Sequence, residues 1–330
     1  MKILVTGADG FIGSHLTERL LSDGHEVRAL VMYNSFNSWG WLDHHASAPP
    51  ENLEVVAGDI RDPRSCQRAV RGCDRVAHLA ALIAIPYSFE APDSYVDTNV
   101  HGTLNMLNAA RDFGVNRFVQ TSTSEVYGSA QYVPIDEKHP VNAQSPYAAS
   151  KTAADQLALS FHAAYGLPTV VARPFNTYGP RQSARAVIPT IITQLLNGDE
   201  VRLGALHPTR DFCFIEDTVS AFVTAITSDG GVGETFNFGS GFEVSIKETA
   251  QLIGKLMGKN IRLTIDEQRL RPGSSEVERL SVNVDKFSAS FGWQAEFPGA
   301  SGLENGLQKT IAWFSNEANL ARYKIARYNV

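Results

Sequence analysis

The stretch Ile3-Leu4-Val5-Thr6-Gly7-Ala8-Asp9-Gly10-Phe11-Ile12-Gly13 decides how this chain folds. Its apolar beginning predicts a short buried strand, and residues 14–21 then show the apolar spacing of a helix. Glycines between a strand and a helix permit a tight turn and let a pyrophosphate approach the helix N-terminus. The stretch therefore predicts the opening of a dinucleotide-binding sheet, with a glycine-rich turn that binds nothing as the alternative.

Strands and helices alternate over the first half of the chain. We expect strands at residues 27–31, 53–57, 75–81, 117–121 and 169–174, and a helix at residues 103–113. Such alternation predicts an α/β fold, a Rossmann-like doubly wound parallel sheet with helices on both faces.

The rhythm changes after about residue 175. Proline and glycine become frequent there, and helical stretches remain at residues 186–196 and 245–257. We expect a Rossmann domain at residues 1–175 and a smaller mixed α/β substrate-binding lobe at residues 176–330. The segment at residues 211–230 is expected to pack back on the first domain.

The composition narrows the class of protein. The 330 residues are 43% hydrophobic and 19% charged, with a net charge of −6, which gives no electrostatic reason to expect nucleic-acid binding. No run approaches the ~20 apolar residues of a membrane span, and the first residues reach glycine too early for a signal peptide. The three cysteines have no ligand spacing and fit a reducing compartment, so a cytoplasmic location is expected. His44-His45 has no carboxylate or cysteine at ligand spacing, so we expect no metal.

A tyrosine and a lysine four residues apart indicate a chemistry. Tyr147 and Lys151 share one face of a helix, downstream of Thr123 and Glu125. A neighbouring ammonium favours the ionised form of a tyrosine, which can then take a proton from an alcohol. The spacing alone also suits an ordinary amphipathic helix, so the rest of the chain has to decide.

One expected element is missing. Many dinucleotide-binding sheets carry an acid at the end of the second strand, where it binds the adenosine ribose. Here this position reads Val31-Met32-Tyr33-Asn34, without a carboxylate and without a basic cluster for a 2′-phosphate. We expect Asn34 or Ser35 to bind the ribose, and NAD rather than NADP.

Together these motifs resemble the extended short-chain dehydrogenase/reductase family, in its sugar-nucleotide branch. The matching elements span nearly the whole chain: residues 6–13, 58–60, 79–81, 98–103, the Tyr147/Lys151 pair, 173–180 and 209–212. The resemblance implies NAD as cofactor, bound by Gly7, Gly10, Phe11, Ile12, Gly13, Asp59, Ile60, Leu79, Ala80, Ala81, Asn99, Thr121, Tyr147, Lys151 and Phe175. It also implies a sugar-nucleotide substrate, bound by Ile85, Ser124, Asn176, Arg185, Val187, Arg210 and Arg271.

The stretch Thr123-Ser124-Glu125-Val126-Tyr127-Gly128 discriminates within this branch. Simple 4-epimerases need no carboxylate there, whereas dehydratases and decarboxylases do. The chain is similar above all to the sugar-nucleotide 4,6-dehydratases of legionaminic-acid-type pathways, on residues 33–43, 80–88, 183–189 and 271–280. The resemblance implies a GDP- or UDP-linked hexose, with N-acetylglucosamine as the expected sugar. It also implies a homodimer, formed through the helix at residues 103–113 and the helix that carries Tyr147.

The expected activity is that of an NAD-dependent hydro-lyase. Tyr147 takes the proton of the C4 hydroxyl during oxidation, Thr123 hydrogen-bonds the same oxygen, and Glu125 removes the C5 proton before water leaves C6. Ser124 stands where many glucose-nucleotide dehydratases carry an aspartate, so Glu125 would pass its proton to the departing oxygen. The alternatives are decarboxylation of a UDP-glucuronate-type substrate, with Arg279 on the carboxylate, and 4-epimerisation. A non-catalytic NAD-sensing protein is a remote alternative.

Overall fold

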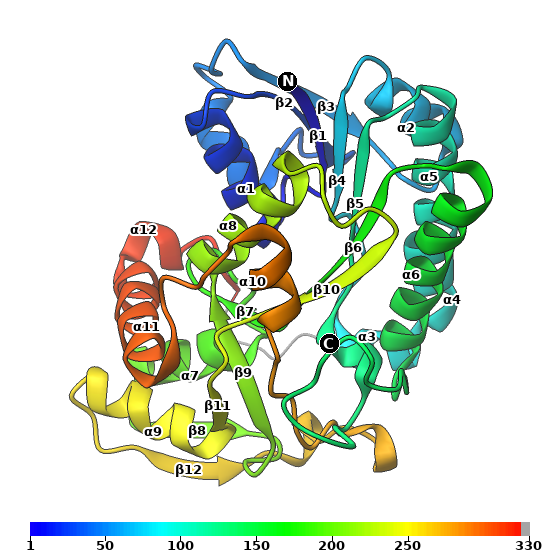
Figure 1. The fold of residues 1–330 in the computed structure, drawn as a ribbon. Helices are drawn as coiled ribbons and strands as arrows, with labels where there is room; N and C mark the ends of the chain where they lie inside the picture. The colour runs from blue at the N-terminus through cyan, green and yellow to red at the C-terminus, as the bar shows by residue number, and fades with distance from the viewer. Residues whose placement is uncertain (325–330) are drawn as a thin grey trace.

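The computed structural model describes residues 1–324, and a seven-stranded sheet lies at its centre (Figure 1). All neighbouring strands in this sheet run parallel, which confirms the predicted fold class. In spatial order the strands are β3 (Leu53–Gly58), β2 (Glu26–Met32), β1 (Lys2–Thr6), β4 (Arg75–His78), β5 (Arg117–Thr121), β6 (Thr169–Pro174) and β10 (Glu234–Phe238).

Helices cover both faces of the large sheet (Figure 1). One face carries α2 (Pro63–Val70), α5 (Gly102–Asp112) and α6 (Pro146–Tyr165), and the other carries α1 (Phe11–Ser22) and α8 (Ile215–Thr227). Successive strand residues point to opposite faces, so Leu4 joins the buried cluster on one side, whereas Ile3 and Val5 join the cluster on the other. Helix α8, from the segment at residues 211–230, contacts α1 and the strands β4, β5 and β6.

The strand order reverses between β1 and β4, which are neighbours in the sheet. A crevice forms at such a switch point, outside the carboxyl ends of the strands. Thr6, the last residue of β1, ties the two strand ends together: its Oγ1 accepts hydrogen bonds of 3.0 Å from the backbone N–H groups of both Leu79 and Ala80. The glycine loop and the residues after β4 therefore lie side by side at this point.

Short helical segments connect these elements. The segment before α5 contains α3 (Ile85–Glu90), α4 (Pro92–Tyr95) and the π-helical turn η2 (Val96–His101). The 3₁₀ turns are η1 (Gly40–His45), η3 (Ser124–Tyr127), η4 (Glu267–Arg269) and η5 (Gly273–Ser275).

The second lobe is smaller and contains two short sheets. These sheets are β11 (Glu243–Ser245), β9 (Thr209–Phe214) and β7 (Asn176–Tyr178), and β12 (Arg262–Ile265) with β8 (Glu200–Leu203). Its helices are α7 (Val187–Asn197), α9 (Ile246–Leu256), α10 (Asp285–Phe291), α11 (Gly299–Ser315) and α12 (Glu317–Leu320). Of the expected lobe at 176–330, residues 325–330 lie outside the described part of the chain.

The chain returns to the large sheet after the second lobe has begun, which the sequence does not predict. After α8 it returns once more, because β10 pairs in parallel with β6 and extends the large sheet. Residues 1–175 alone therefore do not make up the whole sheet. Among residues 1–324, no helix is both long enough and apolar enough to cross a membrane.

Candidate active site

The glycine loop leaves room and hydrogen-bond donors for a pyrophosphate. Gly7 has φ +66°, and a Cβ built on it would lie 2.9 Å from Ala80 N, while a Cβ on Gly13 would lie 2.1 Å from Gly7 O. Helix α1 begins at Phe11, and its N-cap Gly10 provides no side-chain cap. The first N–H groups of α1 therefore remain for an anion, and the dipole of the helix favours negative charge there. These features fit a dinucleotide.

The other expected cofactor residues gather around the same switch point. Asn99 is buried in η2 and makes hydrogen bonds of 2.8–2.9 Å to the backbone of Leu82 and to Ser150 Oγ, so it joins the segment after β4 to α6. Thr121 Oγ1, at the end of β5, is buried and has no hydrogen-bond partner in the described part of the chain, as expected of a group that faces a ligand.

Three expected cofactor residues are already engaged with the protein. Asp59 forms an ion pair of 2.6 Å with Arg61, and the hydrogen bond from Arg61 lowers the pKa of this carboxyl group. Ile60 is buried in the core beside α2 and α5. Phe175 is 1% exposed, and its side chain packs in an apolar cluster with Val126. This side chain therefore belongs to the core next to the catalytic turn η3.

Asp9 is a residue that the sequence reasoning missed. Its Oδ2 accepts a hydrogen bond of 3.4 Å from Met32 N, so a carboxylate does lie at the end of β2, where none occurs in the sequence of that strand. Burial raises the pKa of Asp9. Asn34, the expected ribose ligand, instead accepts hydrogen bonds from the backbone N–H groups of Phe36 and Ser38 and so shapes its own loop.

The expected catalytic residues come from two neighbouring elements. Thr123 caps η3, since its Oγ1 accepts a hydrogen bond of 3.2 Å from Glu125 N. Ser145 caps α6 in the same way, through Ala148 N at 3.1 Å. The caps fix where each element begins, and both Glu125 and Tyr147 are buried where the elements meet.

The electrostatics of Tyr147 differ from the expectation. Burial raises its pKa, the nearby charge of Glu125 acts in the same direction, and a hydrogen bond with the Thr123 hydroxyl opposes the rise. Burial also lowers the pKa of Lys151 to about 8, although the charge of Asp155 opposes this. The expectation that Lys151 holds Tyr147 as a phenolate was therefore wrong in direction for this state of the protein, because the desolvation of both side chains dominates.

A buried polar network below the catalytic residues was also missed. Asp155 Oδ2 pairs with Arg173 Nη2 at 3.0 Å and accepts a hydrogen bond of 2.6 Å from Ser122 Oγ. Arg173 in turn donates to the hydroxyl of Tyr127 at 2.9 Å. The network joins α6, β6 and η3, and thereby positions the helix that carries Tyr147. A signal was present, because Asp155 follows Lys151 by the same four residues as Lys151 follows Tyr147.

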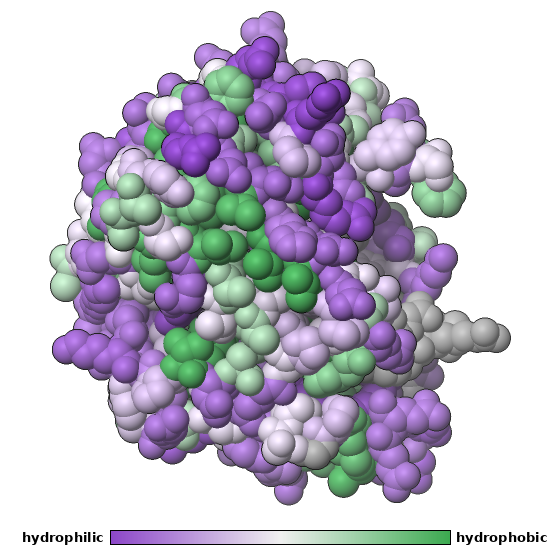
Figure 2. Space-filling view, turned by 90° about the vertical axis from the view of Figure 1, so that its right-hand side faces the viewer, coloured by the Kyte–Doolittle hydropathy of each residue, from purple (hydrophilic) through white to green (hydrophobic). Residues whose placement is uncertain are grey.

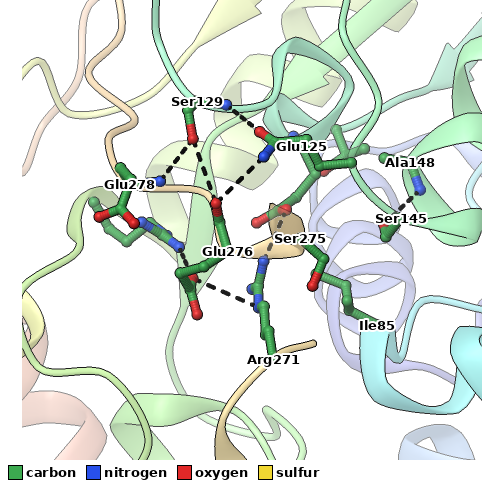
Figure 3. A network of polar contacts seen from close by, with 12 residues as sticks. Ile85, Glu125, Ser129, Ser145, Ala148, Arg271, Ser275, Glu276 and Glu278 are labelled. Carbon is green, nitrogen blue, oxygen red and sulfur yellow. Dashed lines mark hydrogen bonds and ion pairs between the residues drawn. The ribbon is translucent and has the colours of Figure 1, made fainter. Parts of the chain in front are cut away.

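Two arginines of the second lobe form ion pairs with two glutamates at this site. Arg271 Nη1 lies 3.3 Å from Glu125 Oε2, and Arg271 Nε lies 3.7 Å from Glu276 Oε1 (Figure 3). The same Glu276 oxygen lies 3.3 Å from Arg210 Nη2. Burial lowers the pKa of Arg210. The structure thus brings the expected base and two expected substrate ligands into one charged network.

The remaining expected substrate residues differ in burial and in their contacts. Asn176 Oδ1 is buried without a hydrogen-bond partner in the described chain, which fits a group awaiting a ligand. Ser124 is 2% exposed at the start of η3. Ile85 and Val187 begin α3 and α7. Arg185 is exposed. Burial raises the pKa of the Tyr95 hydroxyl, and the positive charge of Arg185 opposes this rise.

The sequence of this chain is similar to those of known sugar-nucleotide enzymes. A family model described as GDP-mannose 4,6 dehydratase matches residues 4–306. A dTDP-glucose 4,6-dehydratase of Streptomyces griseus is 35% identical over 322 residues, which cover 94% of this chain and 93% of that protein. UDP-glucuronic acid decarboxylase 1 of Xenopus tropicalis is 32% identical, over 96% of this chain and 72% of that protein.

A solved structure agrees with the fold over almost the full length. The dTDP-glucose 4,6-dehydratase DesIV of Streptomyces venezuelae, solved with NAD bound, superposes with a TM-score of 0.87 at 30% sequence identity. The match covers 98% of this chain and 99% of that chain.

Proposed function

Because this chain belongs to the GDP-mannose 4,6-dehydratase family of extended short-chain dehydrogenases/reductases, we propose that it is an NAD-dependent sugar-nucleotide 4,6-dehydratase. The observation that carries the proposal is the position of Glu125, a buried carboxylate beside Thr123 and Tyr147. Oxidation at C4 needs one protein base, the tyrosine, whereas removal of the C5 proton needs a second base. A buried carboxylate at this position supplies one.

Each catalytic side chain has one task in this proposal. NAD supplies a hydride acceptor for C4 and, once reduced, a hydride donor for C6. Tyr147 Oη must be ionised to take the proton of the C4 hydroxyl, and the positive charge of a bound oxidised nicotinamide would favour that form against the effect of burial. The Thr123 hydroxyl donates a hydrogen bond to the same sugar oxygen. The 4-keto group makes the C5 proton acidic, and a Glu125 oxygen takes it. Water then leaves from C6. When hydride returns to C6, C5 regains a proton, which balances the proton that Tyr147 took from the C4 hydroxyl.

The departing C6 oxygen needs a proton, and Ser124 is too weak an acid to provide one. Glu125 carries the proton that it has just taken from C5, and we propose that it passes this proton to the departing oxygen. One carboxyl group then serves as base and acid in succession.

Binding is divided between the lobes. We propose that residues 1–175 hold the cofactor at the glycine loop and the switch point, and that the second lobe supplies Asn176, Arg210 and Arg271 for the diphosphate and adjoining groups of the substrate. Arg210 and Arg271 suit a diphosphate, because guanidinium groups offer several donors to phosphate oxygens. Asn176 Oδ1 has no hydrogen-bond partner among residues 1–324, which supports a role as acceptor of a hydrogen bond from the substrate. GDP- or UDP-N-acetylglucosamine is the proposed substrate.

The decarboxylase alternative is less well supported. It assigns the substrate carboxylate to Arg279, but one edge of that guanidinium already donates to both oxygens of Glu243, from Nε at 2.6 Å and from Nη2 at 2.8 Å. The side chain of Arg279 is also half exposed to solvent. The 4-epimerase alternative gives Glu125 no role.

A homodimer is part of the proposal. Figure 2 views the face that carries α5 and α6, and apolar residues gather near its middle. Val96 is 45% exposed just before α5, and Leu104 and Leu157 on the two helices are partly exposed. A second copy that packs its own α5 and α6 on this face would cover these side chains.

Product mass tests the function. The purified protein is incubated with NAD and, separately, with UDP-N-acetylglucosamine, GDP-mannose, dTDP-glucose and UDP-glucuronate, and the nucleotides are analysed by mass spectrometry. A product lighter by one water from a hexose nucleotide supports dehydration. Loss of carbon dioxide from UDP-glucuronate, or no change in mass with any substrate, would contradict it.

A further inference from the structure

A cluster of two histidines and one glutamate lies outside the catalytic residues. We propose that Glu18, His44 and His45 bind a divalent metal ion of the kind that prefers imidazole ligands, such as Zn²⁺. Each side chain offers one ligand atom, and these three atoms all lie within 4.8 Å of one another. His44 Nε2 is 3.1 Å and His45 Nε2 is 3.9 Å from Glu18 Oε1. Two imidazoles and a carboxylate are a common ligand set for zinc.

The hydrogen bond on the far side of His44 determines what its Nε2 can bind. His44 Nδ1 lies 2.9 Å from the carbonyl oxygen of Trp41, and a carbonyl only accepts, so Nδ1 carries a proton. In the neutral ring, Nε2 then presents a lone pair to the carboxylate oxygen of Glu18. Two lone pairs at 3.1 Å repel each other unless a cation lies between them. A second proton or a metal ion can be that cation, and a hydrogen bond from Nδ1 to a carbonyl is typical of metal-binding histidines.

His45 favours the metal over a proton. Its Nε2 is buried and has no hydrogen-bond partner in the described part of the chain, which leaves this atom for a ligand. A proton on this nitrogen would need an acceptor within hydrogen-bond distance, but Glu18 Oε1 lies 3.9 Å away. The centroids of the two rings lie 3.9 Å apart, with the ring planes tilted by 41°, and one ion can bind both rings.

Arg181 competes for the same carboxylate. Its Nη2 lies 2.9 Å from Glu18 Oε1, the oxygen that faces both histidines. A metal must therefore share Glu18 with this guanidinium, and the positive charge weakens binding. Removing the charge of Arg181 should strengthen metal binding. A purely structural role of Glu18, as an ion-pair partner of Arg181, gives no reason for such an effect.

A bound ion would join two segments of the cofactor domain. Glu18 belongs to α1, which follows the glycine loop, and both histidines belong to η1, which follows β2. Local spacing does not predict this cluster, because the carboxylate comes from α1 and strand β2 separates that helix from the histidines. An ion that binds only the folded protein raises its stability by mass action.

Calorimetric titration with Zn²⁺ tests the proposal on the full-length protein after treatment with a chelator. We expect one Zn²⁺ per chain, and no binding of Mg²⁺, which prefers oxygen ligands. His45→Ala and Glu18→Gln should each weaken Zn²⁺ binding about ten-fold or more, and Arg181→Gln should tighten it. His207→Ala is the matched control, because His207 pairs with Glu278 at 2.8 Å on the surface.

Circular dichroism of each variant verifies that it is folded. A second measurement uses Co²⁺, whose visible absorption reports coordination by the histidines and should be lost in His45→Ala. The proposal is overturned if His45→Ala binds Zn²⁺ as tightly as the unmodified protein, or if His207→Ala causes the same loss. It is equally overturned if the unmodified protein binds no Zn²⁺.

Discussion

Arg271 Nη1 lies 3.3 Å from Glu125 Oε2, and 146 positions separate the two residues in the chain. One belongs to the substrate lobe and the other to the catalytic turn after β5. In the proposed function Glu125 must reach C5 of the sugar and Arg271 must reach the diphosphate. The two roles require this ion pair to loosen when the substrate binds, so substrate binding and the freeing of the base are coupled.

Glu276 should act as a positioning residue for the two arginines. Its Oε1 lies 3.3 Å from Arg210 and 3.7 Å from Arg271. Glu276→Gln removes the charge that orients both, so we expect KM for the sugar nucleotide to rise about ten-fold, equivalent to about 1.4 kcal/mol, with kcat nearly unchanged. Steady-state kinetics measure both constants. Glu278→Gln, on the exposed carboxylate next in the same segment, should change neither, and a fall in kcat alone for Glu276→Gln would refute the role.

Tyr147→Phe should abolish the first oxidation. The variant keeps the ring but lacks the oxygen that takes the C4 proton, so the rate should fall by about 10²–10⁴-fold. Stopped-flow absorbance of the reduced nicotinamide measures this step directly. Tyr132→Phe provides the control, because Tyr132 is 44% exposed and its hydroxyl donates a hydrogen bond to Asp136. Normal formation of reduced nicotinamide in Tyr147→Phe would exclude Tyr147 as the base.

Asp9 should determine the affinity for NAD and its preference over NADP. A carboxylate at the end of β2 accepts hydrogen bonds from ribose hydroxyls and repels a 2′-phosphate. Asp9→Asn should weaken NAD binding about ten-fold and narrow the difference from NADP, as measured by equilibrium titration without sugar nucleotide. Asp23→Asn, at the other end of α1, is the matched control. Unchanged affinities for both cofactors would exclude Asp9 from the ribose site.

Acid should destabilise the protein partly through His15. Burial lowers the pKa of His15 from 6.5 to about 4, so the unfolded chain binds the proton more readily than the folded one. Stability from this residue is therefore complete above pH 6.5 and is lost as the pH falls towards 4, by about 2 kcal/mol between pH 7 and pH 5. Denaturant unfolding of His15→Gln should show a smaller difference between these two pH values. An equal difference in both proteins would contradict the assignment.

Local patterns predicted much of this fold. The apolar runs of β1, β2, β3, β5 and β6 and the periodicity of α1, α5, α7 and α9 placed these elements within a few residues. The return of the chain to form β10 was not predicted, because its pairing with β6 depends on contacts between segments far apart in sequence. A short strand such as Glu234–Phe238 carries no signal of which sheet it joins.

The site, too, was predicted where local sequence patterns determine it and missed where contacts between distant segments do. Thr123, Glu125, Tyr147 and Lys151 were predicted as a group, and the structure brings Thr123, Glu125 and Tyr147 to one place. Asp9 was missed because its proximity to Met32 arises only when β1 and β2 pair. The direction of the Tyr147 pKa was also wrong, because a sequence shows a nearby lysine but not how deeply both side chains are buried.

The central claim is that Glu125 turns a C4 oxidation into the elimination of water, and a single-turnover experiment with Glu125→Gln tests it most directly. NAD-loaded protein is mixed with the sugar nucleotide, and reduced nicotinamide and product mass are followed together. We predict that reduced nicotinamide forms and persists, while the dehydrated product forms about 10²–10⁴ times more slowly than with the unmodified protein. Dehydrated product formed at the unmodified rate would contradict the account.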